Sequence, residues 1–374
     1  TLTNRAGSTL TLSFDGNGVE SSGTALGTRA FNNAGVFTKS GGTGPTTILT
    51  DFNNTGTVNV NSGTLTFQEA GTHTNGVFNV DTGHTLRFDH SGDTNRFDGA
   101  SSIVGTGSGI VEFNGGTRTF SDTASLTSTG TVTFSAGITT FDAGTTYSVS
   151  GTTQFSGGPG GGTVHFNTPA TLNQLTFSAG TANFNGATSI TQIDFIDSDF
   201  TPTLGGIGTV TVSGPVNWGN GANISGAGIL NTNGVLNINS NTPVHLNARE
   251  LNNAGIATHA ATSNKMILEN GAEINNLAGA TWTYASANGI NIDGSATEIF
   301  NNAGTFDKTG AGSNIASPAF NNTGILNVNS GTLTLSGTVS QLSGATLTGG
   351  TWNVANGSTL AITTGSNIQT IGTD

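Results

Sequence analysis

Residues 52–67 read FNNTGTVNVNSGTLTF, and residues 320–335 repeat thirteen of these sixteen residues at the same positions. Val58 and Val60 alternate with polar neighbours, and the second half of the stretch shows the same alternation. Successive side chains of a β-strand point to opposite faces, so the alternation predicts two short strands that each have one apolar face. The second copy of the pattern indicates an internal repeat.

Two polar segments that contain glycine, 53–56 and 61–63, lie beside the apolar positions. Gly, and to a lesser degree Asn, tolerates the positive φ that a sharp corner needs. We therefore expect each of these segments to form a corner between strands. One corner followed by two short strands is then the local unit of the chain.

Phenylalanine recurs at an almost constant spacing. Phe113, Phe134, Phe155 and Phe177 are separated by 21, 21 and 22 residues. A unit of about 20 to 22 residues with two or three short strands cannot bury its own apolar face, whereas stacked copies can. The spacing predicts an all-β chain folded as a right-handed parallel β-helix (a β-solenoid), with these four rings stacked inside. At this period, 374 residues would make about 17 or 18 coils.

A β-propeller or a β-sandwich is the competing architecture. Asn-Gly pairs such as Asn75-Gly76 and Asn114-Gly115 are frequent, and this dipeptide favours antiparallel hairpins. Those folds need units of about 40 residues or antiparallel hairpins. The repeated single steps of 21 residues favour the solenoid.

The sequence also contains a longer repeat, in addition to the short one. Residues 2–11 match residues 274–283, and the segment from Phe31 to Lys39 matches the segment from Phe300 to Lys308. The order of unlike coils is kept in both copies. We interpret residues 1–272 as one super-repeat and residues 273–374 as the start of the next, within a single continuous β-solenoid that spans residues 1–374.

The filling of the expected core changes along the chain. Eighteen of the 21 Phe residues lie at or before Phe200, and none lies between residues 201 and 299. In that region the candidates for the interior are aliphatic, and they include Leu236, Ile238, Val244 and Leu246. A domain boundary is one explanation of this change, but we expect one solenoid whose core filling changes near residue 201.

Composition excludes several classes of function. Gly accounts for 58 of 374 residues, and only 8% of residues are charged, against about 25% in an ordinary globular domain. The net charge of −12 argues against nucleic acid as a partner, because phosphate binding needs clustered Lys and Arg. No apolar run is long enough for a membrane span, and the absence of Cys excludes a disulfide scaffold. The chain starts at Thr1, so we expect a mature protein or a piece of a longer one.

Residues 81–98 form the most polar stretch. Eight ionisable side chains occur there: Asp81, His84, Arg87, Asp89, His90, Asp93, Arg96 and Asp98. The Asp and His residues suggest a metal site, but their spacing matches no metal motif and the two Arg would repel a cation. We expect a solvated loop or a local ion-pair patch.

A second acidic group is formed by Asp194, Asp197 and Asp199, and Asp122 and Asp142 could lie on adjacent coils. Paired carboxylates about 5 to 9.5 Å apart are what a glycosidase needs. Asp at turns is also the ordinary outcome for a polar face, and few aromatic residues lie nearby to stack sugars. We therefore assign no catalytic, cofactor-binding or metal-binding residue, and expect no cofactor.

The pattern Asn-Asn-x-Gly-x-Φ-Asn-Val-x-x-Gly-x-Leu (Φ apolar) occurs at 53–65 and 321–333, and less fully at 75–86. With this pattern the chain resembles bacterial β-strand-repeat surface proteins, which include the passenger regions of autotransporters and large secreted adhesins. The resemblance implies a parallel β-helix, an extracellular or cell-surface location, and a role in adhesion or as a structural fibre.

The predicted function is a non-enzymatic extracellular β-solenoid that forms a filament, scaffold or adhesin stalk. The expected partners are neighbouring repeats or copies of the chain, stacked end to end, together with cell-surface or matrix polysaccharide. The first and last strands of the sequence continue the coil pattern, so we expect both ends to continue into further coils. The alternative is a β-helix that binds or cleaves polysaccharide.

Overall fold

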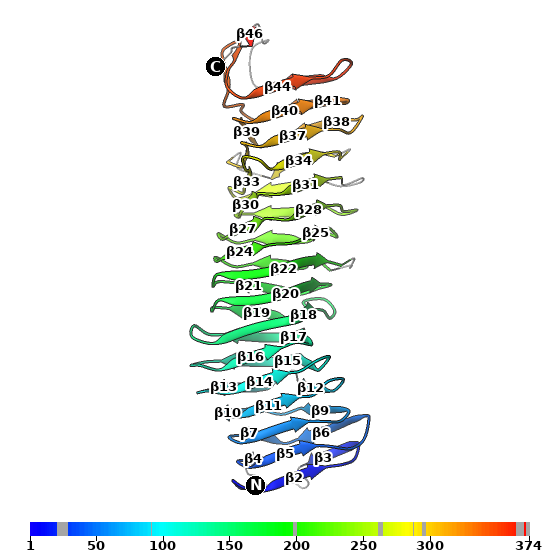
Figure 1. Ribbon diagram of the computed structural model, residues 1–374, viewed down its shortest axis with the longest axis vertical. Helices are drawn as coiled ribbons and strands as arrows, with labels where there is room; N and C mark the ends of the chain where they lie inside the picture. Colours follow the sequence, from blue (N-terminus) through cyan, green and yellow to red (C-terminus); the bar gives the residue numbers. More distant parts are fainter. Residues whose placement is uncertain are drawn as a thin grey trace. The chain divides into compact units, whose positions relative to one another are not determined.

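The computed structural model describes residues 1–20, 29–90, 92–196, 200–260, 265–286, 288–293, 297–363 and 370–371. These residues form strands and turns without any helix, and the chain makes about 14 turns of a parallel β-solenoid (Figure 1). The predicted fold class is therefore confirmed. The contacts divide the chain into two compact units, residues 1–188 and 189–374, which are described separately.

The strands of the first unit, in chain order, are β1 (Leu2–Asn4), β2 (Thr9–Leu12), β3 (Gly16–Glu20), β4 (Ala30–Asn33), β5 (Val36–Lys39), β6 (Pro45–Leu49), β7 (Asp51–Asn54), β8 (Thr57–Val60), β9 (Thr64–Phe67), β10 (Gly71–Thr74), β11 (Val77–Val80), β12 (Thr85–Phe88), β13 (Thr94–Asp98), β14 (Ser102–Gly105), β15 (Ile110–Phe120), β16 (Ser125–Ser128), β17 (Thr131–Phe141), β18 (Thr146–Phe155), β19 (Thr163–Phe166), β20 (Ala170–Phe177) and β21 (Thr181–Phe184).

The strands of the second unit are β22 (Thr188–Phe195), which begins at the boundary, β23 (Thr203–Gly205), β24 (Thr209–Val212), β25 (Val216–Trp218), β26 (Asn223–Ser225), β27 (Ile229–Thr232), β28 (Val235–Ile238), β29 (Val244–Asn247), β30 (Glu250–Asn253), β31 (Ile256–His259), β32 (Met266–Glu269), β33 (Glu273–Asn276), β34 (Thr281–Tyr284), β35 (Ile290–Asp293), β36 (Ile299–Asn302), β37 (Thr305–Lys308), β38 (Ser313–Ala316), β39 (Ala319–Asn322), β40 (Ile325–Val328), β41 (Thr332–Leu335), β42 (Leu342–Ser343), β43 (Thr346–Leu347), β44 (Thr351–Val354), β45 (Thr359–Ile362) and β46 (Thr370–Ile371).

Most strands pair in parallel with the equivalent strand one turn later. In the first unit β5, β8, β11 and β14 pair in succession, so Phe37, Val58, Phe78 and Ile103 lie one above another. In the second unit β27, β30, β33, β36 and β39 pair in the same manner. The pair β42 and β43 is antiparallel. Stacking in register places like residues over like, which is how short strands build one continuous core.

The turns are less uniform than the spacing of Phe predicts. The register step is 21 residues from Phe113 to Phe134, but 18 from Phe166 to Phe184. It rises to 27 from Leu333 to Leu360, and it is 29 from Leu2 to Phe31. The strands on either side of each step remain paired in parallel. The chain consequently makes about 14 turns, fewer than the 17 or 18 predicted.

The predicted ladder of Phe rings is present in the first unit. Phe113, Phe134, Phe155 and Phe177 are buried, with successive ring centroids 5.2, 5.3 and 4.9 Å apart. A second ladder runs beside it through Phe97, Phe120, Phe141, Phe166 and Phe184, with centroids 4.4, 4.5, 5.4 and 4.8 Å apart. Its steps are unequal in sequence, so a search for constant spacing misses it.

The core of the second unit contains mainly aliphatic residues before residue 280. Leu236, Ile238, Val244 and Leu246 are buried, as predicted for this region. Trp282 and Phe300 follow, with ring centroids 5.1 Å apart. No helix among the described residues is long and apolar enough to cross a membrane.

Asparagine forms a buried ladder in each unit. In the first, Asn4 donates from Nδ2 to Oδ1 of Asn33, and Asn33 donates to Asn54, both at 2.7 Å. In the second, the same bonds connect the buried asparagines of four turns: Asn253, Asn276, Asn302 and Asn322. Each amide satisfies the next, which allows polar side chains to lie inside the solenoid.

This ladder corrects the prediction for residues 53–56. Asn53 and Asn54 belong to β7, and Asn54 points into the interior rather than forming a corner. Gly56 does form the corner, but its φ is not positive. A Cβ at Gly56 would lie 2.2 Å from the carbonyl oxygen of Gly35, so close approach of two turns is what requires glycine. The second corner is as predicted, because Gly63 has a φ of +51°.

Candidate functional site

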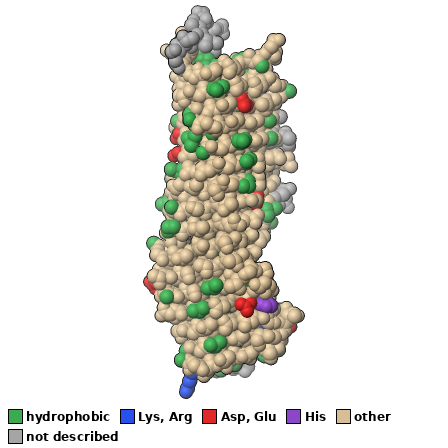
Figure 2. Space-filling model, in the orientation of Figure 1, with side chains coloured by type: hydrophobic (Ala, Val, Ile, Leu, Met, Phe, Trp, Pro, Cys, Tyr) green, Lys and Arg blue, Asp and Glu red, His purple; other side chains and the backbone are tan. Residues whose placement is uncertain are grey.

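The polar stretch 81–98 contains local ion pairs. Arg87 pairs with Glu112 of the next turn, His90 with Asp93 at 2.8 Å, and Arg96 with Asp98 at 3.0 Å. Among the residues that the structure describes, no three His, Asp or Glu side chains are placed to hold a metal ion. The stretch therefore contains a local ion-pair patch, one of the two arrangements predicted for it. Charged side chains are sparse on the face drawn in Figure 2.

Two amides hold the carboxylate of Asp194. Gln192 and Asn217 each donate to it at 2.6 Å. Asp197 and Asp199, the other members of the predicted group, lie outside the described residues. The carboxylate of Asp194 therefore serves as the acceptor for neighbouring amides of the strand face.

Asp122 and Asp142 do follow register partners on adjacent turns, since Phe120 pairs with Phe141. Asp122 has a φ of +60° and accepts a hydrogen bond from the backbone N–H of Gly99 at 2.9 Å. The backbone carbonyl of Asp142 accepts from the Thr145 hydroxyl at 2.7 Å. These contacts shape corners, and they give the two residues a structural role.

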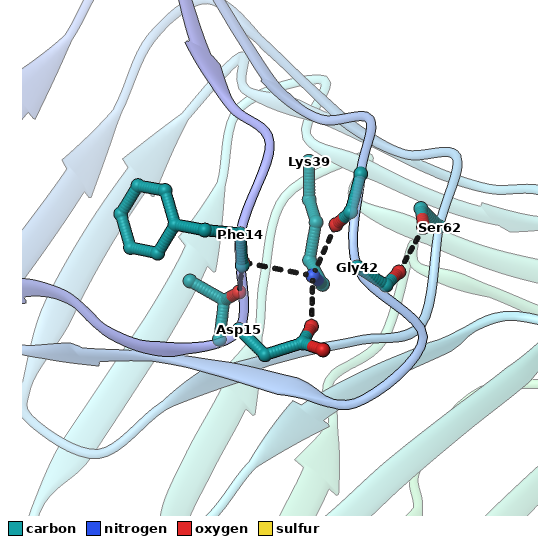
Figure 3. Close-up of polar contacts among 7 residues, drawn as sticks. Phe14, Asp15, Lys39, Gly42 and Ser62 are labelled. Carbon is teal, nitrogen blue, oxygen red and sulfur yellow. Dashed lines mark hydrogen bonds and ion pairs between the residues drawn. The ribbon is translucent and has the colours of Figure 1, made fainter.

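Lys39 is buried and closes a corner of the first unit. Its Nζ donates to the backbone carbonyls of Gly41 at 2.8 Å and Phe14 at 3.3 Å, and pairs with Asp15 at 3.2 Å (Figure 3). Backbone N–H donation from Gly44, and secondarily the Lys39 ammonium, lower the pKa of Asp15. The ammonium therefore joins the corner at Gly41 to Phe14 and Asp15.

Lys308 does the same in the second unit. Its Nζ donates to the carbonyls of Gly310, Gly312 and Ser330, and burial lowers the pKa of this lysine. Lys39 and Lys308 occupy matching places in the similar segments 31–39 and 300–308, and both donate to the carbonyl of the glycine two residues later. Each of the two lysines therefore stabilises a corner by donating to backbone carbonyls.

Two arginines and two histidines also lie in the core. Arg118 donates to the carbonyl of Phe88 at 3.0 Å and lies over the Phe113 ring, and Arg249 donates to carbonyls of Gly206 and Gly208. Burial lowers the pKa of each arginine to about 10. It also lowers the pKa of two histidines, to about 4 for His73 and about 3 for His259. Each of these side chains is at most 1% exposed, so it is closed to a ligand.

Two surface grooves lie in the second unit. The first has a volume of about 420 Å³, and we call it the Asn237 groove. Asn237 donates to Asn217 at 2.8 Å, and Asn217 donates to Asp194. These two amides of the groove therefore form hydrogen bonds to neighbouring side chains on the same strand face. Its lining also includes Trp218, which is only 1% exposed.

The second groove has a volume of about 540 Å³, and we call it the His245 groove. Strands of four successive turns, β23, β26, β29 and β32, contribute its outward side chains. Asn223 and His245 are register partners, and so are Ser225 and Asn247. The remaining strand positions are Thr203 and Glu269, and the corners add Thr201, Gly221, Thr242 and Pro243.

His245 and Glu269 form the polar centre of the His245 groove. Nδ1 of His245 lies 2.8 Å from Oε1 of Glu269, and Asn247 donates to Oε2 at 3.0 Å. Each carboxylate oxygen therefore has one partner from the protein, and the pair is partly exposed, with 30% of the His245 side chain and 18% of the Glu269 side chain accessible. Asp293 is the register partner of Glu269 on the next turn, but it does not line the groove.

Sequence reasoning did not identify this groove. His245 and Asn247 occupy alternate positions of an ordinary strand, and similar polar residues occur on every turn. Glu269 follows 22 residues after Asn247, a distance that has meaning only once the register of the turns is known. Searches against protein-family models, curated proteins and solved structures found no match.

Proposed function

We propose that this chain is a structural β-solenoid of the extracellular space or cell surface, which serves as a filament, scaffold or adhesin stalk and performs no catalysis. The observation that carries the proposal is the set of internal ladders in each unit. Phe rings and Asn amides repeat from turn to turn, and their contacts connect successive turns into a rigid interior. A low content of charge and an outer surface of Asn, Thr and Ser suit exposure to water.

Neighbouring repeats or copies of the chain, stacked end to end, are the partners that we propose for assembly. Within each unit the backbone groups of a turn pair with the turns before and after it. The same parallel pairing can continue onto any further turn of similar sequence, and such a contact is open-ended. Cell-surface or matrix polysaccharide is the second proposed partner, and bacterial surface proteins with β-strand repeats are the proposed relatives.

Localisation in the native source cells tests the proposal. Antibodies against the purified chain should label the outside of intact cells, and external protease should remove the label. Labelling confined to the interior of permeabilised cells would contradict an extracellular scaffold.

An activity assay tests the claim that the chain is not an enzyme. Incubation with polysaccharides should release no new reducing ends, and Asp194→Asn should behave as the unaltered chain because Asp194 accepts hydrogen bonds within the strand face. Hydrolysis by the unaltered chain that is lost in this variant would favour the alternative of a polysaccharide-cleaving β-helix.

A further inference from the structure

The His245 groove carries an unusual combination of satisfied and unsatisfied polar groups. Its carboxylate is held by His245 and Asn247. By contrast, Thr203, Asn223 and Ser225 point outward, are half-buried, and make no side-chain hydrogen bond within the part of the chain that the structure describes. A fixed centre beside free hydroxyl and amide groups is a surface prepared to exchange hydrogen bonds with a ligand.

The charges of the groove restrict the class of ligand. His245 and Glu269 are the ionisable side chains among its lining residues, and they face each other at 2.8 Å. No Lys or Arg lines it to attract a phosphate or a carboxylate, and no three acidic or His side chains among the described residues are placed for a metal. Pro243 is the one apolar side chain among the residues that line the groove, which disfavours a lipid. Neutral molecules rich in hydroxyl groups remain.

The length of the groove favours a chain over a single small molecule. Its outward side chains come from four successive turns, and neighbouring parallel strands lie about 4.8 Å apart, so three spacings give a span of roughly 14 Å. Hydroxyl and amide groups repeat along this span, at Thr203, Asn223 and Asn247. A repeating array of donors and acceptors matches a polymer whose own hydroxyl groups repeat.

We propose that the His245 groove binds a segment of neutral polysaccharide. Asn223 and Ser225 exchange hydrogen bonds with sugar hydroxyls, and the Glu269 carboxylate, held by His245 and Asn247, accepts from a further hydroxyl. Glycoside cleavage needs two carboxyl groups, and Glu269 is the carboxylate that lines the groove, so the site binds without cleaving. This inference rests on the polysaccharide partner proposed above and gives it a location.

Isothermal titration of the full chain with neutral hexasaccharides tests the site: cellohexaose, maltohexaose, mannohexaose and xylohexaose, with hexagalacturonate as the anionic comparison. At least one neutral hexasaccharide should bind, and more tightly than hexagalacturonate. Asn223→Ala and Glu269→Gln should each weaken that binding by about tenfold or more. Glu250→Gln is the matched control, because Glu250 is also an outward carboxylate that accepts from an amide, Asn275, yet lies outside the groove.

Three outcomes would overturn the inference: no binding of any neutral hexasaccharide, equal loss in the Glu250→Gln control, or release of shorter sugars during the titration. Asn223 makes no side-chain hydrogen bond to any residue that the structure describes, so its variant should fold even if the Glu269 variant does not. Failure of sugar binding leaves the localisation test of the scaffold unaffected, and failure of that test leaves the titration unaffected. The two proposals can therefore fail separately.

Discussion

Nδ2 of Asn276 donates a hydrogen bond of 2.7 Å to Oδ1 of Asn302, its counterpart one turn later, and a second bond of 2.9 Å to the carbonyl oxygen of Thr305. Asn276 in turn accepts from Asn253 at 2.9 Å. A buried amide therefore links three turns. In the ladder of the first unit, Asn33 makes corresponding bonds to Asn54 and to the carbonyl of Thr57.

Asn276→Ala should be clearly destabilising, because it removes these bonds and leaves the Asn253 amide and the Thr305 carbonyl short of partners. We expect a loss of about 1 to 3 kcal/mol in the free energy of unfolding, measured by denaturant titration. Asn252→Ala is the control, since Asn252 belongs to the half-exposed row outside the core and water can replace its partners. Equal effects of both substitutions would show that the buried ladder has no special energetic role.

Phe134→Ala should destabilise the first unit by about 3 to 5 kcal/mol, because the ring is 1% exposed and lies between Phe113 and Phe155. Thermal and denaturant unfolding measure the effect. Ile138→Ala, at a side chain that is 47% exposed, should change stability far less. A small effect of Phe134→Ala would mean that the ring stack is not the core of this unit.

Two glycines allow the cost of close approach between turns to be measured separately from the cost of a positive φ. At Gly56 a Cβ would lie 2.2 Å from a backbone oxygen of the previous turn, whereas at Gly83, with a φ of +81°, nothing lies within 4 Å. Gly83→Ala should cost about 1 to 2 kcal/mol from the left-handed backbone alone. Gly56→Ala must push two turns apart and should cost more, as measured by the urea midpoints of the two variants. The reverse order would contradict the close approach.

Acid should weaken the fold partly through His73. Burial lowers its pKa from 6.5 to about 4, despite a hydrogen bond with Asn95. Between pH 6.5 and about pH 4, His73 is protonated in the unfolded chain but neutral in the folded chain. The contribution of neutral His73 to the free energy of unfolding is therefore complete above pH 6.5 and is lost as the pH falls towards 4. The loss is about 1.4 kcal/mol for each pH unit.

The measurement for His73 is the difference in unfolding free energy between the original chain and His73→Gln, followed from pH 7 to pH 4. The glutamine variant cannot titrate, so its stability should fall less steeply over this range. Subtraction removes the carboxylates, which titrate in both proteins. Parallel pH curves for the two proteins would show that His73 does not contribute to acid sensitivity.

The strands, the repeat and the first ladder of Phe rings could be predicted because their signals are local or regular. Alternation in residues 52–67 gives each strand an inner and an outer face, and the constant steps of 21 residues place Phe134 over Phe113. Gly63 could be assigned to a corner because glycine tolerates the positive φ that the corner needs.

Other features depend on the number of residues between one strand and its partner on the next turn. Short-range sequence patterns do not reveal this number. The second ring ladder has unequal steps, and Asn54 faces inward because its partner one turn below, Asn33, satisfies it there. The same applies to the His245 groove, where Glu269 meets His245 only through the register of β29 and β32. Local patterning thus determined a solenoid of short strands, while the pairing of turns decided which polar side chains became buried ladders and which became a groove.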